Sequence, residues 1–185
     1  MLVCLLAAAP AVAHTGDVVG GLVGGLAHPV LGADHVAAMV AVGLWGALLG
    51  TPAIVLLPVV FPLVMALGGA LGILGVPLPG AAIGIAASAV MLGLAVAFAA
   101  RPPMWVAAVL VGAFAIFHGQ AHGAELPPGA DAVAYSIGFV VATGLLHLVG
   151  IALGLVSRWP AGRIAVRGAG GAIALFGVTV LARLA

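Results

Sequence analysis

The sequence contains very little charge. Its 185 residues include five arginines and four acidic residues but neither lysine nor asparagine, so that 5% of the chain is charged. An ordinary soluble domain is about 25% charged, and a soluble fold of this size could not cover its surface with so few polar groups. The shortage of charge therefore excludes a water-soluble globular protein and a disordered chain. It also excludes a nucleic-acid-binding protein, because nothing here would neutralise a run of phosphates.

Cysteine is nearly absent as well. The single cysteine, Cys4, lies in the apolar segment 1–13, which ends in Ala11-Val12-Ala13. Small residues in that pattern are typical of a signal-peptidase site, so we predict a signal peptide over 1–13; the alternative is the stub of a first helix. If the segment is removed, the mature chain over 14–185 has no thiol, which excludes a disulfide framework and a thiolate metal site.

Long apolar runs are what the sequence does contain. It is 65% hydrophobic, and runs of about 20 apolar residues, the length that crosses a bilayer, alternate with short proline-containing connections. Few segments alternate as barrel strands do. We therefore predict an all-α fold, a single polytopic transmembrane helix bundle with about six full spans, at 33–50, 53–76, 80–100, 104–122, 132–157 and 164–184.

The segment 16–31 is Gly-rich, broken by Pro29 and short for a span, so we predict a re-entrant or broken half-helix. If it does not cross, an external N-terminus places four of the five arginines on the cytoplasmic side, as the positive-inside rule requires. These four are Arg101, Arg158, Arg163 and Arg167. We therefore predict a multi-pass membrane protein whose mature N-terminus lies outside.

Several residues have expected structural roles. Small residues spaced along a helix let two backbones approach closely, and we expect this of Gly68, Gly72, Gly75, Gly150 and Gly154. Asp131 precedes a predicted span and is expected to cap it. Aromatic residues near span ends are expected at the membrane interface; they are Trp45, Trp105 and Trp159.

Two short segments hold most of the ionisable groups within the apolar regions. One contains His28, Asp34 and His35, and the other contains His118, His122 and Glu125. His118 and His122 are four residues apart and share a helix face. The topology places both segments at the outer ends of their spans. Imidazole and carboxylate without thiolate suit Ni, Co or Zn, and Cu less exclusively, so we predict one outward-facing metal site from these six residues.

Both segments resemble the motifs of a known family. The stretches HPVLGADHVAAMVAVGLWG (28–46), FHGQAHGAE (117–125) and AHTG (13–16) are similar to those of the HupE/UreJ proteins. The resemblance implies a permease of the bacterial inner membrane for nickel, in some members cobalt, that serves hydrogenase or urease maturation. It also implies functional importance for His28, Asp34, His35 and Glu125, with His118 and His122 in the second motif. Neither enzymatic activity nor a permanently bound cofactor is expected.

Four further residues are candidates for contact with the metal. His14 and Asp17 lie near the predicted mature N-terminus and are candidates for metal capture there. Met39 is either a soft ligand one turn from His35 or a packing residue. His147 lies deeper, in the predicted span 132–157; it is either a relay site or an interhelical hydrogen-bonding residue, with Thr143 or Ser136 as its partner.

Other functions remain open at this level. His118 and His122 have the spacing of a zinc-protease motif, so an intramembrane metal-dependent hydrolase is one alternative, although Gly119 stands where that motif has its general base. A haem-binding membrane subunit and a metal sensor are two others. The chain has no phosphate-binding GxxxxGK[ST] loop, so any transport is that of a secondary permease rather than an ATPase.

Overall fold

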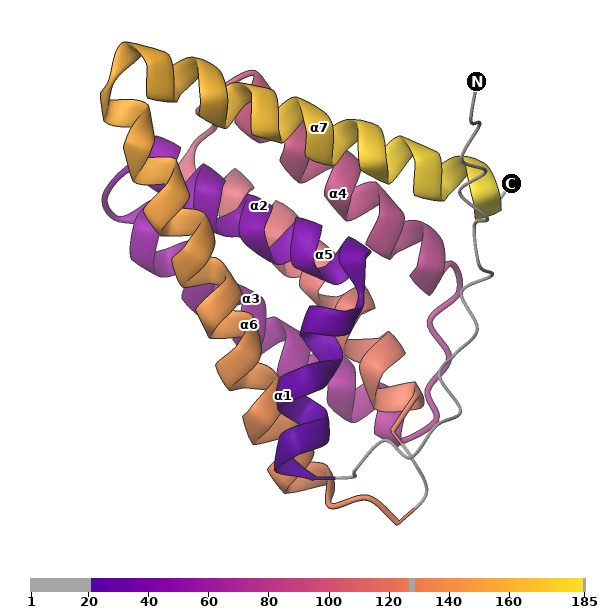
Figure 1. Cartoon of the computed structure of the whole chain (residues 1–185). Coiled ribbons are helices and arrows are strands. Elements are labelled where there is room, and N and C mark those ends of the chain that lie inside the picture. Colours follow the sequence, from indigo (N-terminus) through magenta and orange to yellow (C-terminus); the bar gives the residue numbers. More distant parts are fainter. Residues whose placement is uncertain (1–20, 127–128, 185) are drawn as a thin grey trace, which may run out of the picture.

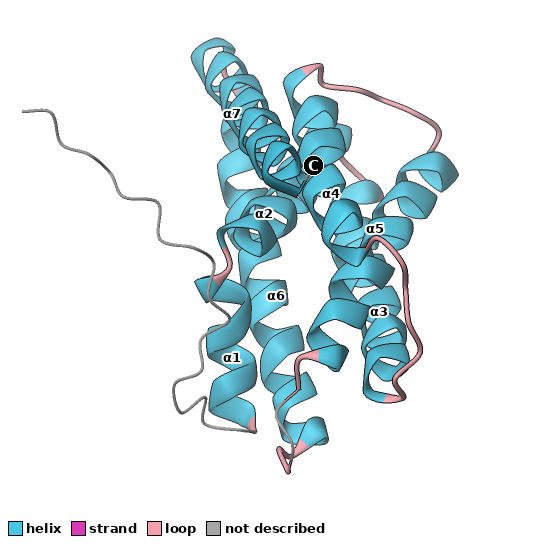
Figure 2. Cartoon of the chain, turned by 90° about the vertical axis from the view of Figure 1, so that its right-hand side faces the viewer, coloured by secondary structure: helices cyan, strands magenta, loops and turns pink. Residues whose placement is uncertain are grey.

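The regular structure is entirely helical in the part of the chain described by the computed structural model, residues 21–126 and 129–184 (Figures 1 and 2). This confirms the predicted fold class. The elements are α1 (Leu22–Leu31), α2 (Ala33–Leu49), α3 (Ala53–Ile73), α4 (Ala81–Ala97), α5 (Met104–Ala124), α6 (Ala132–Leu155), the 3-10 turn η1 (Val156–Arg158) and α7 (Pro160–Leu184). The predicted signal segment lies outside the described residues, as do His14 and Asp17.

Helix length separates the predicted spans into two groups. Four helices are long and apolar enough to cross a membrane, namely α3, α5, α6 extended through η1, and α7. Helices α2 and α4 have 17 residues each, or about 25 Å at 1.5 Å per residue, against a hydrocarbon core of about 30 Å. The pair α1 and α2 passes the same test only as one broken span, so that four or five full spans are present among the described residues.

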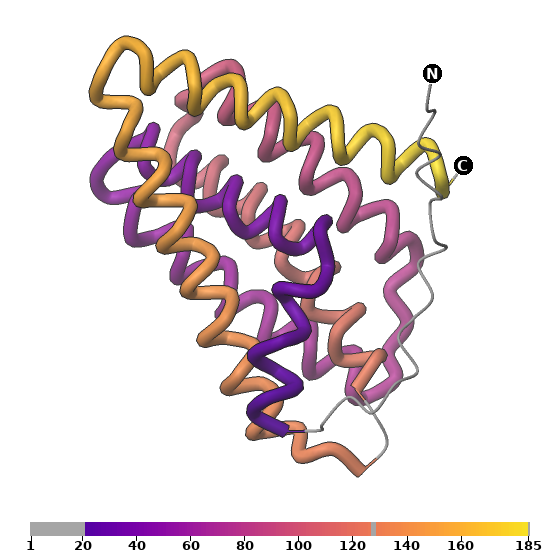
Figure 3. Tube along the Cα trace, viewed as in Figure 1, coloured from indigo at the N-terminus to yellow at the C-terminus, as the bar shows by residue number. Residues whose placement is uncertain are grey.

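The break in the first span comes at Gly32, not at the predicted Pro29. Helices α1 and α2 meet at 85° (Figure 3). Pro29 lies inside α1, whereas Gly32 takes an extended conformation with φ −92° and ψ 109°. Proline removes one helical hydrogen bond, but the chain leaves the helix only where the backbone dihedrals change. The predicted half-helix is thus α1, and its bend brings His28 and His35 to the same region.

Helix α2 occupies the centre of the bundle, where it contacts α1, α3, α4, α6 and α7. Its residues over 38–46 are buried, including Met39 and Trp45, except for the partly buried Val40. The interfacial role predicted for Trp45 is therefore wrong: it lies in the core, and its Nε1 donates to the Ala100 carbonyl at 2.9 Å. Trp105 and Trp159 are exposed, as their interfacial role requires.

Glycine sets the distance between the main helix pairs. A Cβ on Gly150 would collide with the Val40 carbonyl where α6 crosses α2, and one on Gly68 with the Ile116 carbonyl where α3 meets α5. Gly72 and Gly154 lie equally close to their neighbours, which confirms four of the five predicted packing glycines. Gly75 is the exception; its φ is +70° in the turn after α3, and nothing lies within 4 Å of a Cβ there.

The connections between helices gather at two ends of the bundle. Figure 1 shows the α2–α3, α4–α5 and α6–α7 connections at the upper left and the α3–α4 and α5–α6 connections at the lower right. Arg101, Arg158 and Arg163 belong to the first end, where Arg167 also donates to the Ala97 carbonyl at 2.7 Å. Asp131 at the other end caps α6 as predicted, accepting from the Val133 and Ala134 amides at 3.0 Å each.

Replacing Gly150 with alanine tests the close approach of α2 and α6. We expect Gly150→Ala to destabilise the protein by about 1–3 kcal/mol, because the helices must separate to admit a methyl group. Unfolding in detergent, followed by helical circular dichroism against denaturant, measures the change. Gly144→Ala is the matched control on the same helix, since nothing lies within 4 Å of its Cβ position. Equal stability of the two variants would contradict the packing described here.

Candidate metal site

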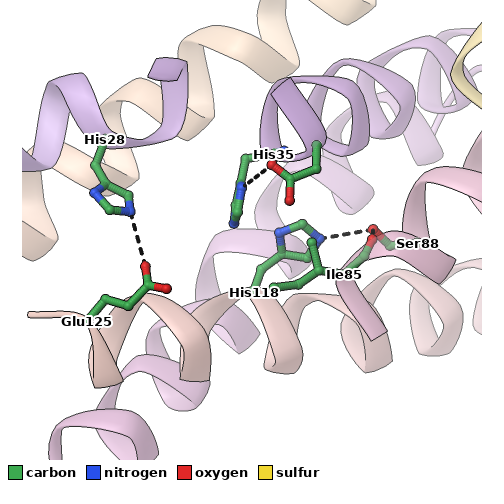
Figure 4. Close-up of polar contacts among 7 residues, drawn as sticks. His28, His35, Ile85, Ser88, His118 and Glu125 are labelled. Atoms are coloured by element: carbon green, nitrogen blue, oxygen red, sulfur yellow. Dashed lines mark hydrogen bonds and ion pairs between the residues drawn. The ribbon is translucent and has the colours of Figure 1, made fainter. Parts of the chain in front are cut away.

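The first turn of α2 holds His35 in a defined orientation. Asp34 Oδ1 accepts hydrogen bonds from the His35 backbone amide at 3.0 Å and from its Nδ1 at 2.9 Å (Figure 4). A carboxylate on Nδ1 fixes the proton there and leaves the lone pair on Nε2. That Nε2 is buried and has no hydrogen-bond partner within the described ranges. His35 therefore presents Nε2 as a free ligand atom.

A serine on a neighbouring helix orients His118 in the same way. The Ser88 hydroxyl donates to the Ile85 carbonyl at 2.6 Å, so it accepts from His118 Nε2, which lies 2.9 Å away. The proton of the neutral ring is then on Nε2 and the lone pair is on Nδ1. His118 is fully buried, and its Nδ1 has no partner among the residues that the structure describes. The hydrogen bond from α4 thus prepares His118 as a second ligand.

His122 stands between the other histidines. It lies one helical turn after His118 in α5, and its ring centroid is 4.3 Å from that of His35 and 4.7 Å from that of His28. It is 4% exposed, yet both of its ring nitrogens lack a hydrogen-bond partner in the described structure. Leaving such a group unpaired in an apolar interior costs about 1–3 kcal/mol, so a missing partner is implied.

Two groups of three side chains can each hold a metal ion, and they share His122. The inner cluster is His35, His118 and His122, and the outer cluster is His28, His122 and Glu125. In each cluster one ligand atom from every residue lies within 4.8 Å of the others. The inner cluster is mostly buried, whereas the side chain of Glu125 is 63% exposed. Because both clusters include His122, they adjoin each other in space.

The outer cluster lies where two helices end. His28 is in the last turn of α1 and His122 in the last turn of α5, with Glu125 at the C-cap. His28 Nε2 and Glu125 Oε2 face each other at 3.6 Å (Figure 4). The C-terminal end of a helix carries partial negative charge, which adds to that of the Glu125 carboxylate. The outer cluster is therefore favourable for a cation.

Five of the six predicted site residues belong to the two clusters. The sixth, Asp34, orients His35 instead of joining either group. Ser88, which orients His118, is a residue of the site that the sequence analysis missed. Its signal was present, because it is the single polar residue in the apolar stretch 81–97. Nothing in the sequence pairs that serine with His118, thirty residues away.

The structure also decides between the alternatives for two other residues. Met39 is fully buried in the hydrophobic core, which favours packing over ligation. His147 makes no hydrogen bond to Thr143 or Ser136: both of its ring nitrogens are without a partner in the described ranges, and so is Thr143 Oγ1. A bond to either suggested partner is therefore absent, and both lie in α6 with His147. The relay role stays a prediction.

A cavity of about 160 Å³ reaches His122 between α3, α5 and α6. Tyr135 and Ser136 are the other polar residues along its otherwise mostly apolar wall. The volume has room for several water molecules. A partly hydrated ion would therefore have space beside the shared imidazole.

The position of Gly119 bears on the hydrolase alternative. A Cβ at Gly119 would collide with the Met65 carbonyl, because α5 lies directly against α3 there. The general base of a zinc-protease motif would occupy this position. The backbone contact leaves no room for a side chain at 119, so the general base of the zinc-protease motif has no counterpart at this position.

These features define a multi-pass helical membrane protein with a buried imidazole site at one end of its bundle. The chain belongs to the HupE/UreJ family, because the family described as HupE / UreJ protein matches residues 2–180. It is also 47% identical over 169 residues to Protein HupE of Rhizobium leguminosarum bv. viciae, covering 91% of this chain and 88% of that protein. No solved structure matches it.

The Ser88 hydrogen bond can be tested by its removal. We expect Ser88→Ala to weaken nickel binding by about 10–100-fold, the usual effect of losing a group that orients a metal ligand. Equilibrium dialysis of radiolabelled nickel with the purified protein measures this. Ser157→Ala, in the η1 turn, is the control and should bind as the wild type does. Unaltered affinity in Ser88→Ala would refute the orienting role.

Proposed function

We propose that this protein is a secondary permease that moves nickel, with cobalt as a second substrate, across the bacterial inner membrane. The observation that carries the proposal is the convergence of three histidines, two buried and one partly buried, whose free ring nitrogens have no partner in the described structure. Polar groups in a membrane interior are costly and mark ion pathways. The family resemblance in the two histidine motifs supports the same function.

The donor set favours these metals. The inner cluster offers three imidazoles, and the outer cluster offers two imidazoles and a carboxylate. Imidazole suits Ni, Co, Zn and Cu, whereas Mg and Ca require oxygen ligands. The absence of thiolate from both clusters makes cuprous ion a poor substrate. Within the remaining group, the family resemblance supports nickel or cobalt.

The shared histidine suggests how the ion advances. In the proposed path the ion first binds His28, Glu125 and His122, with Glu125 exposed for capture. It then exchanges the two outer ligands for His35 and His118 while it stays bound to His122. Handing an ion between overlapping sites avoids a fully unliganded state in the apolar interior, and conduction requires binding that is weak enough at each step to release.

The direction follows from the charge distribution. Arg101, Arg158, Arg163 and Arg167 gather at the end of the bundle away from the clusters. The positive-inside rule favours a cytoplasmic position for that end, and in the proposed topology the clusters face outward and load from the periplasm. The imported metal would supply hydrogenase or urease maturation. Capture of metal inside the cell maintains the gradient in this scheme.

His122 is the residue whose loss should stop transport. We expect His122→Phe to reduce uptake of radiolabelled nickel to background in cells lacking other nickel carriers, since both clusters lose a ligand. Phenylalanine fits among the neighbouring rings of Phe139 and His28. Gln120→Ala is the control on the same helix, because Gln120 faces Val76 instead of the clusters. Normal uptake by His122→Phe at equal expression would overturn the proposed site.

Glu125 should affect capture more than translocation. Without the carboxylate, Glu125→Gln should raise the nickel concentration for half-maximal uptake roughly tenfold, because a charged cleft concentrates its counter-ion. The maximal rate should change little. The comparison is His35→Ala, which should lower the maximal rate because it removes an inner ligand. The same kinetic defect in both variants would contradict the division into an outer and an inner cluster.

The alternatives predict different results in reconstituted vesicles. A hydrolase would bind nickel or zinc without accumulating it, and would cleave a lipid or peptide. A haem-binding subunit would show a Soret band in the purified protein. A sensor would bind the metal with no flux. Accumulation of nickel inside vesicles that contain only this protein separates the permease from all three.

A further inference from the structure

Two polar side chains deeper in the bundle belong to neither cluster. His147 and Thr143 are both fully buried in α6, and they are four residues apart and therefore on one helix face. Both ring nitrogens of His147 and the Thr143 hydroxyl lack hydrogen-bond partners among the described residues. A histidine or threonine that serves only helix packing in a membrane makes an interhelical hydrogen bond. These two make none.

A backbone carbonyl faces the same place from α3. Pro62 has no N–H, so the carbonyl of Pro58, four residues earlier, receives no helical hydrogen bond from it. That carbonyl lies beside the His147 ring but does not reach hydrogen-bond geometry with it. In a membrane, a carbonyl that proline frees from helical bonding is satisfied by a neighbouring helix, a side chain, water or an ion. The His147 ring is thus close to a carbonyl of a second helix, and Thr143 lies one turn away from it on the same face of α6.

Phe61 separates this group from the inner cluster. It is fully buried in α3, and its ring centroid lies 5.6 Å from that of His118 and 5.3 Å from that of His147. One aromatic side chain therefore contacts the last imidazole of the inner cluster on one side and the deep histidine on the other. Phe61 is thus the side chain that lies between the inner cluster and the deep histidine.

We propose that His147, Thr143 and the Pro58 carbonyl form a deep cation station, which receives the metal ion from the inner cluster past Phe61. The inference rests on the proposed permease function. With one imidazole and two neutral oxygens, the deep station binds a divalent ion more weakly than the three imidazoles of the inner cluster. A weaker site further along suits release toward the cytoplasm, because transport requires that the ion can leave.

The first test separates nickel binding from nickel transport in purified protein and in vesicles. We expect His147→Leu to bind nickel at equilibrium within about twofold of the wild type but to take it up about tenfold more slowly, since only the later ligand is lost. Thr143→Val, which keeps the side-chain shape, should slow uptake about threefold by the same reasoning. Thr179→Val is the control, because that hydroxyl bonds the Phe176 carbonyl in α7.

The second test adds a ligand instead of removing one. Thr143→His would place a second imidazole one turn from His147, and two imidazoles at that spacing bind a divalent metal on one helix face. The variant should retain one additional nickel ion per protein after washing and should transport more slowly, because the ion is trapped. If Thr143→His retains extra nickel and the double variant Thr143→His with His147→Leu does not, the extra ion is located at the deep station.

The outcomes distinguish this inference from the function on which it rests. If wild-type vesicles take up no nickel, the permease proposal itself fails. Wild-type uptake rates in His147→Leu and Thr143→Val would overturn the deep station alone. Parallel loss of binding and uptake in His147→Leu would also overturn it, because His147 would then act by supporting the inner cluster. If His147→Leu does not assemble, Thr143→His decides: unchanged retention and unchanged uptake reject the station.

Discussion

The site depends on imidazole nitrogens that make no hydrogen bond within the described structure. In an apolar interior every polar atom needs a partner, yet His35, His118 and His122 present free nitrogens that have none in the described structure. The hydrogen bonds that two of these rings do make fix the orientation of their free nitrogens. Asp34 and Ser88 each occupy one nitrogen of a ring and leave the other facing the cluster. The bundle therefore maintains an unsatisfied site, and a metal ion is the partner that we propose for it.

Close helix packing brings these rings together. The glycines of α3 and α5, and those of α2 and α6, let the backbones approach to a distance that no side chain would permit. The bend at Gly32 adds a second contribution, because it turns α1 away from α2 and brings His28 beside His122. A Cβ at Gly32 would press on His35 Nδ1, at 2.7 Å. Small residues thus serve the site as well as the fold.

Much of this could be predicted from the chain. The apolar runs located every long helix, the shared face of His118 and His122 followed from helical spacing, and the motifs identified the family. The errors have physical causes. Trp45 lies near a span end but in a central helix, so it is buried. Pro29 interrupts hydrogen bonding without bending the chain, and Gly75 ends a helix instead of packing against one. The burial of Trp45 depends on neighbours that are distant in sequence, whereas the other two errors concern the local backbone conformation.

Composition by itself determined that the chain is a helical membrane protein, because long apolar runs are stable in lipid. The helical repeat indicated which polar residues share a face and bear the chemistry. Tertiary structure decided how that chemistry is divided. It separated one predicted six-residue site into two clusters joined by His122, made Asp34 an orienting residue and recruited Ser88 from α4. Ligand geometry is set by side chains from different helices, and their relative positions come only from packing.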